Sequence, residues 1–140
     1  HPEQGKLTLA DLRERTGSPW FRPEGFFIAS EVEDDSAIAA FTWTKIPTGQ
    51  EQSELSPSGE IYVVGVNPQA QGGGLGRTLT LRALAYLACA EDENGEPLRA
   101  IDLYVDADNT TAYSLYTSLG FGVATVDRMY APAQQDAPAA

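Results

Sequence analysis

Residues 60–77 constrain this chain more than any other stretch, because a strand, a glycine loop and a helix follow one another there. Ile61–Val66 is rich in β-branched residues and predicts a buried strand. Asn67-Pro68 ends that strand, and four glycines stand between residues 72 and 76. From Leu75 onwards, apolar residues recur at helical spacing and predict an amphipathic helix. The chain therefore passes from a strand, through a flexible loop, into a helix N-terminus.

This order of elements is typical of an anion-binding loop. Glycines let the backbone come close to a ligand, and the first turn of a helix presents unpaired N–H groups at the positive end of its dipole. A phosphate or pyrophosphate suits such a loop. Arg77 and Arg82 supply positive charge nearby.

Two common phosphate-binding motifs do not fit. A Walker loop would have Gly and Lys where this chain has Gln71 and Arg77. A dinucleotide fingerprint would use Gly74 and Gly76 and then need a third glycine at Leu79. A plain turn stays an alternative, although four glycines within five residues cost more backbone entropy than a turn requires.

The pattern Gln-x-x-Gly-x-Gly after a Val-x-Val strand resembles the acyl-CoA pyrophosphate loop of the GNAT acetyltransferase family. The resemblance implies acetyl-CoA as co-substrate. It also implies backbone contacts to the pantetheine from the strand, contacts to the pyrophosphate from the loop, and a pantetheine contact from Asn109, which alternatively only caps its helix. The cofactor-binding residues predicted in this way are Val64, Gly65, Val66, Gln71, Gly72, Gly73, Gly74, Leu75, Gly76, Arg77 and Asn109.

Length and charge limit the function classes. A chain of 140 residues forms one domain with a sizeable core. Its net charge of −11 argues against nucleic acid and anionic membranes as partners. No apolar run reaches the roughly 18 residues of a membrane span, and no secretory leader is visible, so we expect a cytoplasmic protein.

Cysteine and histidine are scarce. Cys89 is the single cysteine, which excludes an internal disulfide, and we expect it to be a small buried side chain. His1 is the single histidine, so a Ser-His-Asp system is not credible. No cluster has metal-ligand spacing, and we expect no metal.

Periodicity and turn residues predict an α+β fold with a mixed central sheet flanked by helices. The predicted strands cover residues 26–29, 36–46, 61–66, 99–105 and 121–130, the first two as a hairpin, and the predicted helices cover 8–16, 75–90 and 109–119. Residues 47–59 are predicted to form a surface loop, and 132–140 a disordered tail. In the GNAT family the sheet splays apart after the central strand. The resemblance therefore implies a single GNAT domain over 1–131, whose first strand and helix would lie upstream.

Four segments carry a closer resemblance, to the C-terminal domain of the mycothiol synthase family. They are His1–Gly5, Trp43–Lys45, Glu60–Val66 and Leu103–Asn109. The resemblance implies acetylation of the cysteinyl amine of a glucosaminyl-inositol conjugate, with an upstream GNAT-like domain in the same polypeptide. It also implies Glu3, Lys45 and Tyr104 as substrate-binding residues, although the first two could be plain surface charges and Tyr104 could pack over the sheet.

This chain departs from that family at three places. Gly72 and Gly73 stand where a basic residue is common, Asp106 replaces a more usual Glu, and the 47–59 loop is enlarged. Phosphate binding would then depend more on backbone amides. Each departure leaves room for another acceptor.

Two residues are candidates for acid–base chemistry. Glu60, at the entrance of the central strand, is the candidate base that takes a proton from the amine, and a solvent-exposed strand-end glutamate is its alternative. By resemblance, Tyr116 is the candidate acid for the departing thiolate. Its alternative is packing with its helix neighbours, and Tyr113 is the rival one turn earlier.

Three functions stay open from the sequence. The first is acetyl transfer in mycothiol synthesis. The second is a GNAT enzyme for another amine, such as a protein N-terminus, an antibiotic or a polyamine. The third is a non-catalytic acyl-CoA-binding module, which the presence of both Glu60 and Tyr116 disfavours.

Overall fold

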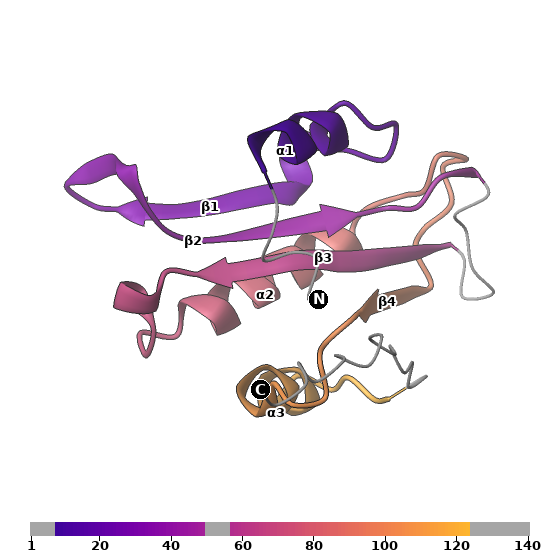
Figure 1. Ribbon diagram of the computed structural model, residues 1–140. Coiled ribbons are helices and arrows are strands. Elements are labelled where there is room, and N and C mark those ends of the chain that lie inside the picture. The colour runs from indigo at the N-terminus through magenta and orange to yellow at the C-terminus, as the bar shows by residue number, and fades with distance from the viewer. Residues whose placement is uncertain (1–7, 50–56, 124–140) are drawn as a thin grey trace, which may run out of the picture.

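The computed structural model describes residues 8–49 and 57–123 (Figure 1). Its sheet has four strands in the order β1-β2-β3-β4, and three α-helices accompany it. In chain order the elements are α1 (Leu9–Thr16), β1 (Phe26–Glu31), β2 (Asp34–Lys45), β3 (Ser58–Val66), α2 (Leu75–Ala88), β4 (Ala100–Leu103) and α3 (Thr110–Ser118). Short 3-10 turns lie at Pro23–Gly25 and Pro68–Ala70.

Most predicted elements are confirmed, with corrections at their ends. The hairpin of β1 and β2 is antiparallel as expected. β3 begins at Ser58, so the predicted loop was wrong over its last two residues, which pair with β4. β4 is shorter than the predicted 99–105. Phe121–Val123 are not strand, and the rest of the predicted last strand and the tail lie outside the described residues.

The central strand β3 has a different neighbour on each side. It pairs with β2 in antiparallel fashion up to Ala40 and Val66. It pairs with β4 in parallel, but only from Ser58–Ala100 to Ile61–Leu103. Beyond Ile61, β3 continues for five residues while β4 turns away, as Figure 1 shows. The predicted splaying of the sheet after the central strand is confirmed.

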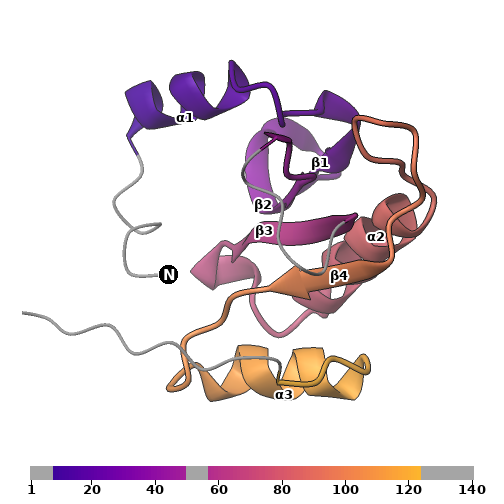
Figure 2. The same ribbon diagram turned by 90° about the vertical axis from the view of Figure 1, so that its right-hand side faces the viewer.

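The main apolar core lies between the sheet and α2. Its buried members are Ile46, Ile61, Ala83 and Leu87. Partly buried side chains from β3, β4 and the segment after α3 pack around them, among them Val64, Ile101, Leu103 and Phe121. Figure 2 shows α2 along one face of the sheet and α1 away from that face. None of the helices in the described ranges has the length and apolar character of a membrane span.

The other face of the sheet carries a cluster of aromatic side chains. Trp43 is almost fully buried, and the rings of Trp20, Trp43 and Tyr62 contact one another with centroids 5.3–5.5 Å apart. The cluster continues along the hairpin through Phe26, which stacks on Phe41 at 6.0 Å. Arg15, in the last turn of α1, donates a hydrogen bond from Nη1 to the Tyr62 hydroxyl and so ties this helix to the cluster. The middle of the sheet therefore carries side-chain packing on both faces.

Gly25 marks a point of close packing between β2 and α2, and it gives a stability prediction. A Cβ there would collide with Thr44 Oγ1 and lie 2.7 Å from Tyr86 Cε1. We expect Gly25→Ala to lower the free energy of unfolding by about 1–3 kcal/mol through overpacking, measured by urea denaturation. Gly17→Ala is the matched control, because its Cβ would meet only ordinary contacts at 3.5 Å. Equal stability of the two variants would contradict the prediction.

Candidate functional site

The part of β3 beyond its pairing with β4 is the first component of the candidate site. Val63 pairs with Trp43 and Ile61 with Thr44, so Tyr62 is an extra residue in the pairing, a β-bulge. The bulge stands where pairing with β4 ends. From this point to Val66, the edge of β3 that faced β4 has no paired strand among the described residues. Its N–H and C=O groups can therefore bind an extended ligand.

The glycine loop continues directly from this edge. Asn67 Oδ1 accepts a hydrogen bond from the Gln69 amide at 3.0 Å, which shapes the turn. Gly72 and Gly74 have φ of 88° and 79°, which is the left-handed region that favours glycine. No atom lies within 4 Å of where their Cβ atoms would stand. The glycines thus form an open cradle, and their conformation rather than crowding requires glycine.

The cradle opens onto the N-terminus of α2. Gly74 caps the helix without a side chain, so the first-turn amides have no side-chain acceptor on the cap residue. Arg77 is exposed in this turn, and its Nη1 donates to Ser118 Oγ on α3 at 3.3 Å. The glycine loop thus lies at a helix N-terminus with an arginine beside it, and its binding of pyrophosphate stays a prediction.

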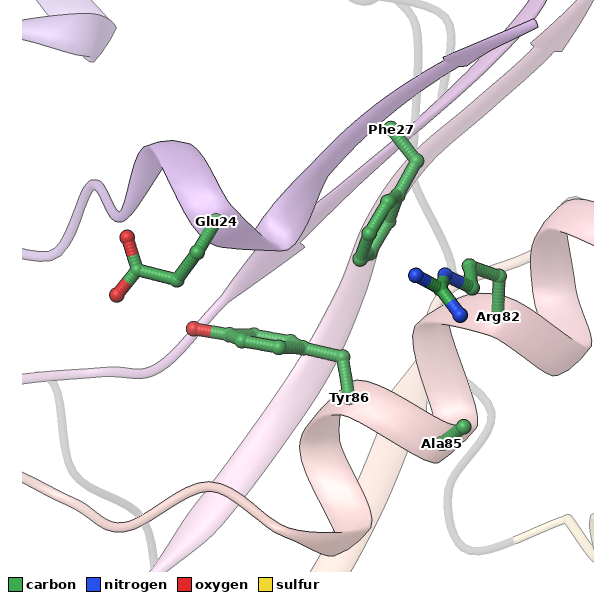
Figure 3. Close-up of a pocket in the computed structure, with 5 residues that line it drawn as sticks. All are labelled: Glu24, Phe27, Arg82, Ala85 and Tyr86. Atoms are coloured by element: carbon green, nitrogen blue, oxygen red, sulfur yellow. The ribbon is translucent and has the colours of Figure 1, made fainter.

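Arg82 does not join this loop. Its guanidinium lies 5.3 Å from the centroid of the Phe27 ring, in a pocket of about 270 Å³ between β1 and α2 (Figure 3). Glu24 and Tyr86 line the same pocket. Burial, followed by the charge of Glu24, raises the pKa of Tyr86 and keeps its phenol protonated at neutral pH. The sequence suggested that Arg82 adds positive charge near the glycine loop, but the structure places its guanidinium in this pocket instead.

Glu60 lies within β3, on the face turned away from α2. Its chain neighbour Ile61 is in the core under α2, and successive strand residues point to opposite faces. Glu60 pairs with Lys45 on β2 and with Asp102 on β4. It is half-buried. A base in this position can reach a ligand on the aromatic face of the sheet.

Lys45 is held by aromatic rings. Its ammonium nitrogen lies 4.8 Å from the Trp20 ring centroid and 5.6 Å from that of Tyr62. Such cation–π contacts orient a flexible lysine. Trp20 and Trp43 are both buried. The structure thus brings Lys45 and Glu60 together, as the substrate and base predictions require.

Tyr116 is half-buried on α3, with its ring 6.0 Å from that of Phe121. Burial raises the pKa of Tyr116, so its phenol stays protonated well above neutral pH. The rival Tyr113 is 43% exposed. The packing of Tyr116 against Phe121 agrees with its alternative structural role, and an acid role is compatible with the same position.

The remaining residues singled out from the sequence lie at separate positions in the chain. Asn109 caps α3 through a hydrogen bond that its Oδ1 accepts from the Ala112 amide at 3.2 Å, so the capping alternative is observed. Tyr104, just beyond β4, is 67% exposed. Glu3 lies outside the described residues. Cys89 is exposed at the end of α2, so the expectation that it is buried was wrong.

Sequence reasoning missed two residues beside Glu60. Asp102 on β4 pairs with Glu60. Tyr62, the bulged residue of β3, comes two positions after Glu60 and points to the same face of the sheet. The signal for Asp102 was present, because it alternates with Ile101 and Leu103 in the sequence. What the alternation does not give is the strand register that sets it opposite Glu60. Within residues 8–49 and 57–123, no group of three or more His, Cys, Asp or Glu side chains could hold a metal ion.

Comparison with known proteins gives the family. The acetyltransferase (GNAT) family profile matches residues 3–121. The chain belongs to the GNAT acetyltransferase family. Among named members, the mycothiol acetyltransferase of Rothia mucilaginosa (strain DY-18) is 99% identical over 140 residues, which are 100% of this chain and 40% of that protein. The mycothiol acetyltransferase of Nocardiopsis dassonvillei is 50% identical over 139 residues, which are 99% of this chain and 40% of that protein.

Solved structures support the GNAT fold. The aminoglycoside N-acetyltransferase AAC(6')-Iy in complex with CoA aligns with a TM-score of 0.62 at 18% identity, covering 90% of this chain and 86% of that one. At this identity the likeness concerns the fold alone. The GNAT chain described here spans only 40% of the length of these two curated relatives.

Proposed function

We propose that this GNAT domain transfers an acetyl group from acetyl-CoA to the cysteinyl amine of a glucosaminyl-inositol conjugate, the last step of mycothiol synthesis. The observation that carries the proposal is the edge of β3 beyond its pairing with β4, which begins two residues after Glu60 on the same strand and leads into the open glycine cradle. The names of relatives at 99% and 50% identity support the acceptor.

The residues present fit acetyl-CoA. The Val64–Val66 edge offers backbone N–H and C=O groups in the extended geometry that pantetheine amides can pair with. The left-handed glycines leave room for a diphosphate at the α2 N-terminus. Acetyl-CoA supplies the reactive thioester when bound, and a β3 amide can polarise its carbonyl oxygen. Arg77 adds positive charge in a chain whose net charge is −11.

Glu60 and Tyr116 divide the proton transfers in this proposal. Glu60 accepts a proton from the ammonium group of the acceptor, which frees the nitrogen lone pair for attack. Tyr116 donates a proton to the thiolate that leaves. Lys45, held over Trp20 and Tyr62, contacts the sugar or inositol hydroxyls together with Glu3 and Tyr104. We further propose that an upstream GNAT-like domain in the same polypeptide completes the enzyme, and a cytoplasmic location stays a prediction.

The glycine cradle gives a binding prediction with a matched control. Gly74→Ala forces a residue with a Cβ into φ of 79°, which costs about 1–2 kcal/mol. We expect the Kd for CoA to rise about 5- to 30-fold, because the loop must leave its binding conformation. Gly73→Ala adds the same methyl group without a left-handed φ, and its Cβ would meet only the Ala70 carbonyl oxygen at an ordinary 3.8 Å, so its Kd should stay within about twofold. Calorimetry measures both, and equal effects would contradict a role of this loop conformation in CoA binding.

The proposed function is tested by free-thiol release from acetyl-CoA. The whole polypeptide that contains this domain is assayed with the cysteinyl conjugate, with a panel of other primary amines, and without acceptor. We expect thiol release to depend on the conjugate. Turnover with another amine alone would keep acetyl transfer and refute the mycothiol acceptor. CoA binding without turnover on any amine would favour the non-catalytic binding module.

A further inference from the structure

Three charged residues form a row across the sheet. Lys45 on β2 pairs with Glu60 on β3, and Glu60 pairs with Asp102 on β4. Paired residues on neighbouring strands are about 5 Å apart between Cα atoms. A cation and a second carboxylate therefore flank the candidate base from opposite sides.

The packing places all three side chains on the same face. Ile46, Ile61 and Ile101, the residues that follow or precede them in sequence, all belong to the core under α2. Leu103, on the other side of Asp102, also packs there. Because strand residues alternate between faces, the three charged side chains point away from α2, toward the face that carries Trp20 and Tyr62.

We propose that Asp102 is a positioning residue that raises the proton affinity of Glu60. This inference rests on the proposed function, in which Glu60 takes a proton from the acceptor. In that step an N–H bond of the ammonium group breaks, an O–H bond forms on Glu60, and the lone pair stays on nitrogen. A second negative charge beside a carboxylate disfavours its ionised form. Asp102 thereby makes Glu60 a stronger base.

The surroundings of Asp102 favour such an effect. Partial burial raises the pKa of Asp102 above that of an exposed aspartate. The same burial reduces solvent screening, so its charge acts more strongly on a neighbour than a surface charge would. An acidic pair also attracts a cationic amine to this part of the sheet.

Other charged or titratable groups face Glu60 from the neighbouring elements. Lys45 acts in the opposite direction from β2, although its ammonium group lies over the rings of Trp20 and Tyr62. Tyr62 stands on the same strand, and Arg15 of α1 reaches it through a hydrogen bond. Tyr104 lies two residues beyond Asp102. The helix α2 packs on the opposite face and contributes no charge here.

The test is the pH profile of kcat/KM for the Asp102→Asn variant in the whole polypeptide with the conjugate. Loss of the neighbouring charge lowers the pKa of Glu60, so the acid limb should move to lower pH by about half a unit to one unit. The plateau should fall several-fold, because the base is weaker. An unmoved limb would overturn the proposal.

Three further variants make the result specific. Asp102→Glu keeps the charge and should retain the original limb. Lys45→Gln removes the opposing charge and should move the limb to higher pH. Asp35→Asn removes an exposed carboxylate ten residues from Lys45 along β2, so it changes the net charge equally and should leave the profile unchanged. If the acid limb of Asp35→Asn moved as far as that of Asp102→Asn, the shift would reflect net charge and the proposed local role of Asp102 would be refuted.

A second measurement keeps the proposal testable if a variant fails to fold or loses its activity. Carbon-detected NMR titration of the Glu60 carboxyl in the unmodified and Asp102→Glu proteins, compared with Asp102→Asn and Asp102→Ser, reads its pKa directly. The proposal requires a lower pKa in both neutral variants, and equal values overturn it. If the unmodified polypeptide turns over the conjugate and the acid limb of Asp102→Asn does not move, only the role of Asp102 is refuted and the proposed function stands. Absence of turnover in the unmodified polypeptide would refute the proposed function, and this inference with it.

Discussion

Glu60→Gln should lower kcat at neutral pH by about 10²- to 10⁴-fold, the usual contribution of a positioned general base. The amide keeps the size of the side chain and cannot take a proton from the acceptor ammonium group. The Glu60 side chain is on the face of the sheet that points away from the core under α2, so we expect Glu60→Gln to fold normally. The Kd for CoA should stay within about twofold, since the proposed CoA contacts come from the other end of β3 and from the glycine loop. Steady-state kinetics and calorimetry measure the two quantities.

Two controls separate base catalysis from charge. Glu31→Gln removes an exposed strand carboxylate at the end of β1 and should leave kcat unchanged. Activity of Glu60→Gln should recover in part as pH rises, because a larger fraction of the acceptor amine is then already neutral. A kcat equal to that of the unmodified enzyme would refute Glu60 as the base.

Tyr116→Phe should lower kcat by about 10²-fold, at the low end of general acid catalysis. Proton transfer from a phenol of ordinary pKa to a thiolate is uphill by about 2 kcal/mol, and burial raises the pKa of Tyr116 further. The same rise keeps the phenol protonated, so no loss of activity from Tyr116 is expected below pH about 10. Single-turnover thiol release isolates this step from product dissociation.

The choice of leaving group provides the decisive comparison for Tyr116. An acetyl thioester of a more acidic thiol needs less help from an acid, so the effect of Tyr116→Phe should shrink toward twofold with that donor. Tyr113→Phe, one turn earlier and 43% exposed, is the matched control and should behave like the unmodified enzyme. An equal loss with both donors would favour the packing of Tyr116 against Phe121 as its role.

Local chemistry made the elements and the glycine loop predictable. A capping box of Thr8 and Asp11 starts α1. Gly120 has a φ of 97° just past α3, the left-handed conformation in which a glycine ends a helix. The strand–glycine–helix order from Ile61 to Leu75 requires only neighbours in sequence. These features depend on the backbone conformation of a few consecutive residues, which the local sequence specifies directly.

Features set by tertiary packing could not be predicted in the same way. The pairing of Glu60 with Asp102 depends on the register between strands about 40 residues apart in the chain. The cation–π contacts of Lys45 depend on where α1 and its following turn place Trp20. Cys89 belongs to a helical pattern that reads as apolar, yet α2 ends there and leaves it exposed. In each case the deciding contact comes from a distant segment.

Comparison of kcat/KM between acceptors tests the proposed function most directly. The whole polypeptide, supplied with acetyl-CoA, is given the cysteinyl-glucosaminyl-inositol conjugate, the same compound without its cysteinyl group, and a set of simple primary amines. Acetylation of the cysteinyl amine, followed by mass spectrometry, should proceed with a kcat/KM at least about 10³-fold above that of any other amine, because the site must recognise hydroxyl groups that the simple amines lack. Equal or higher kcat/KM on a simple amine would contradict the mycothiol acceptor.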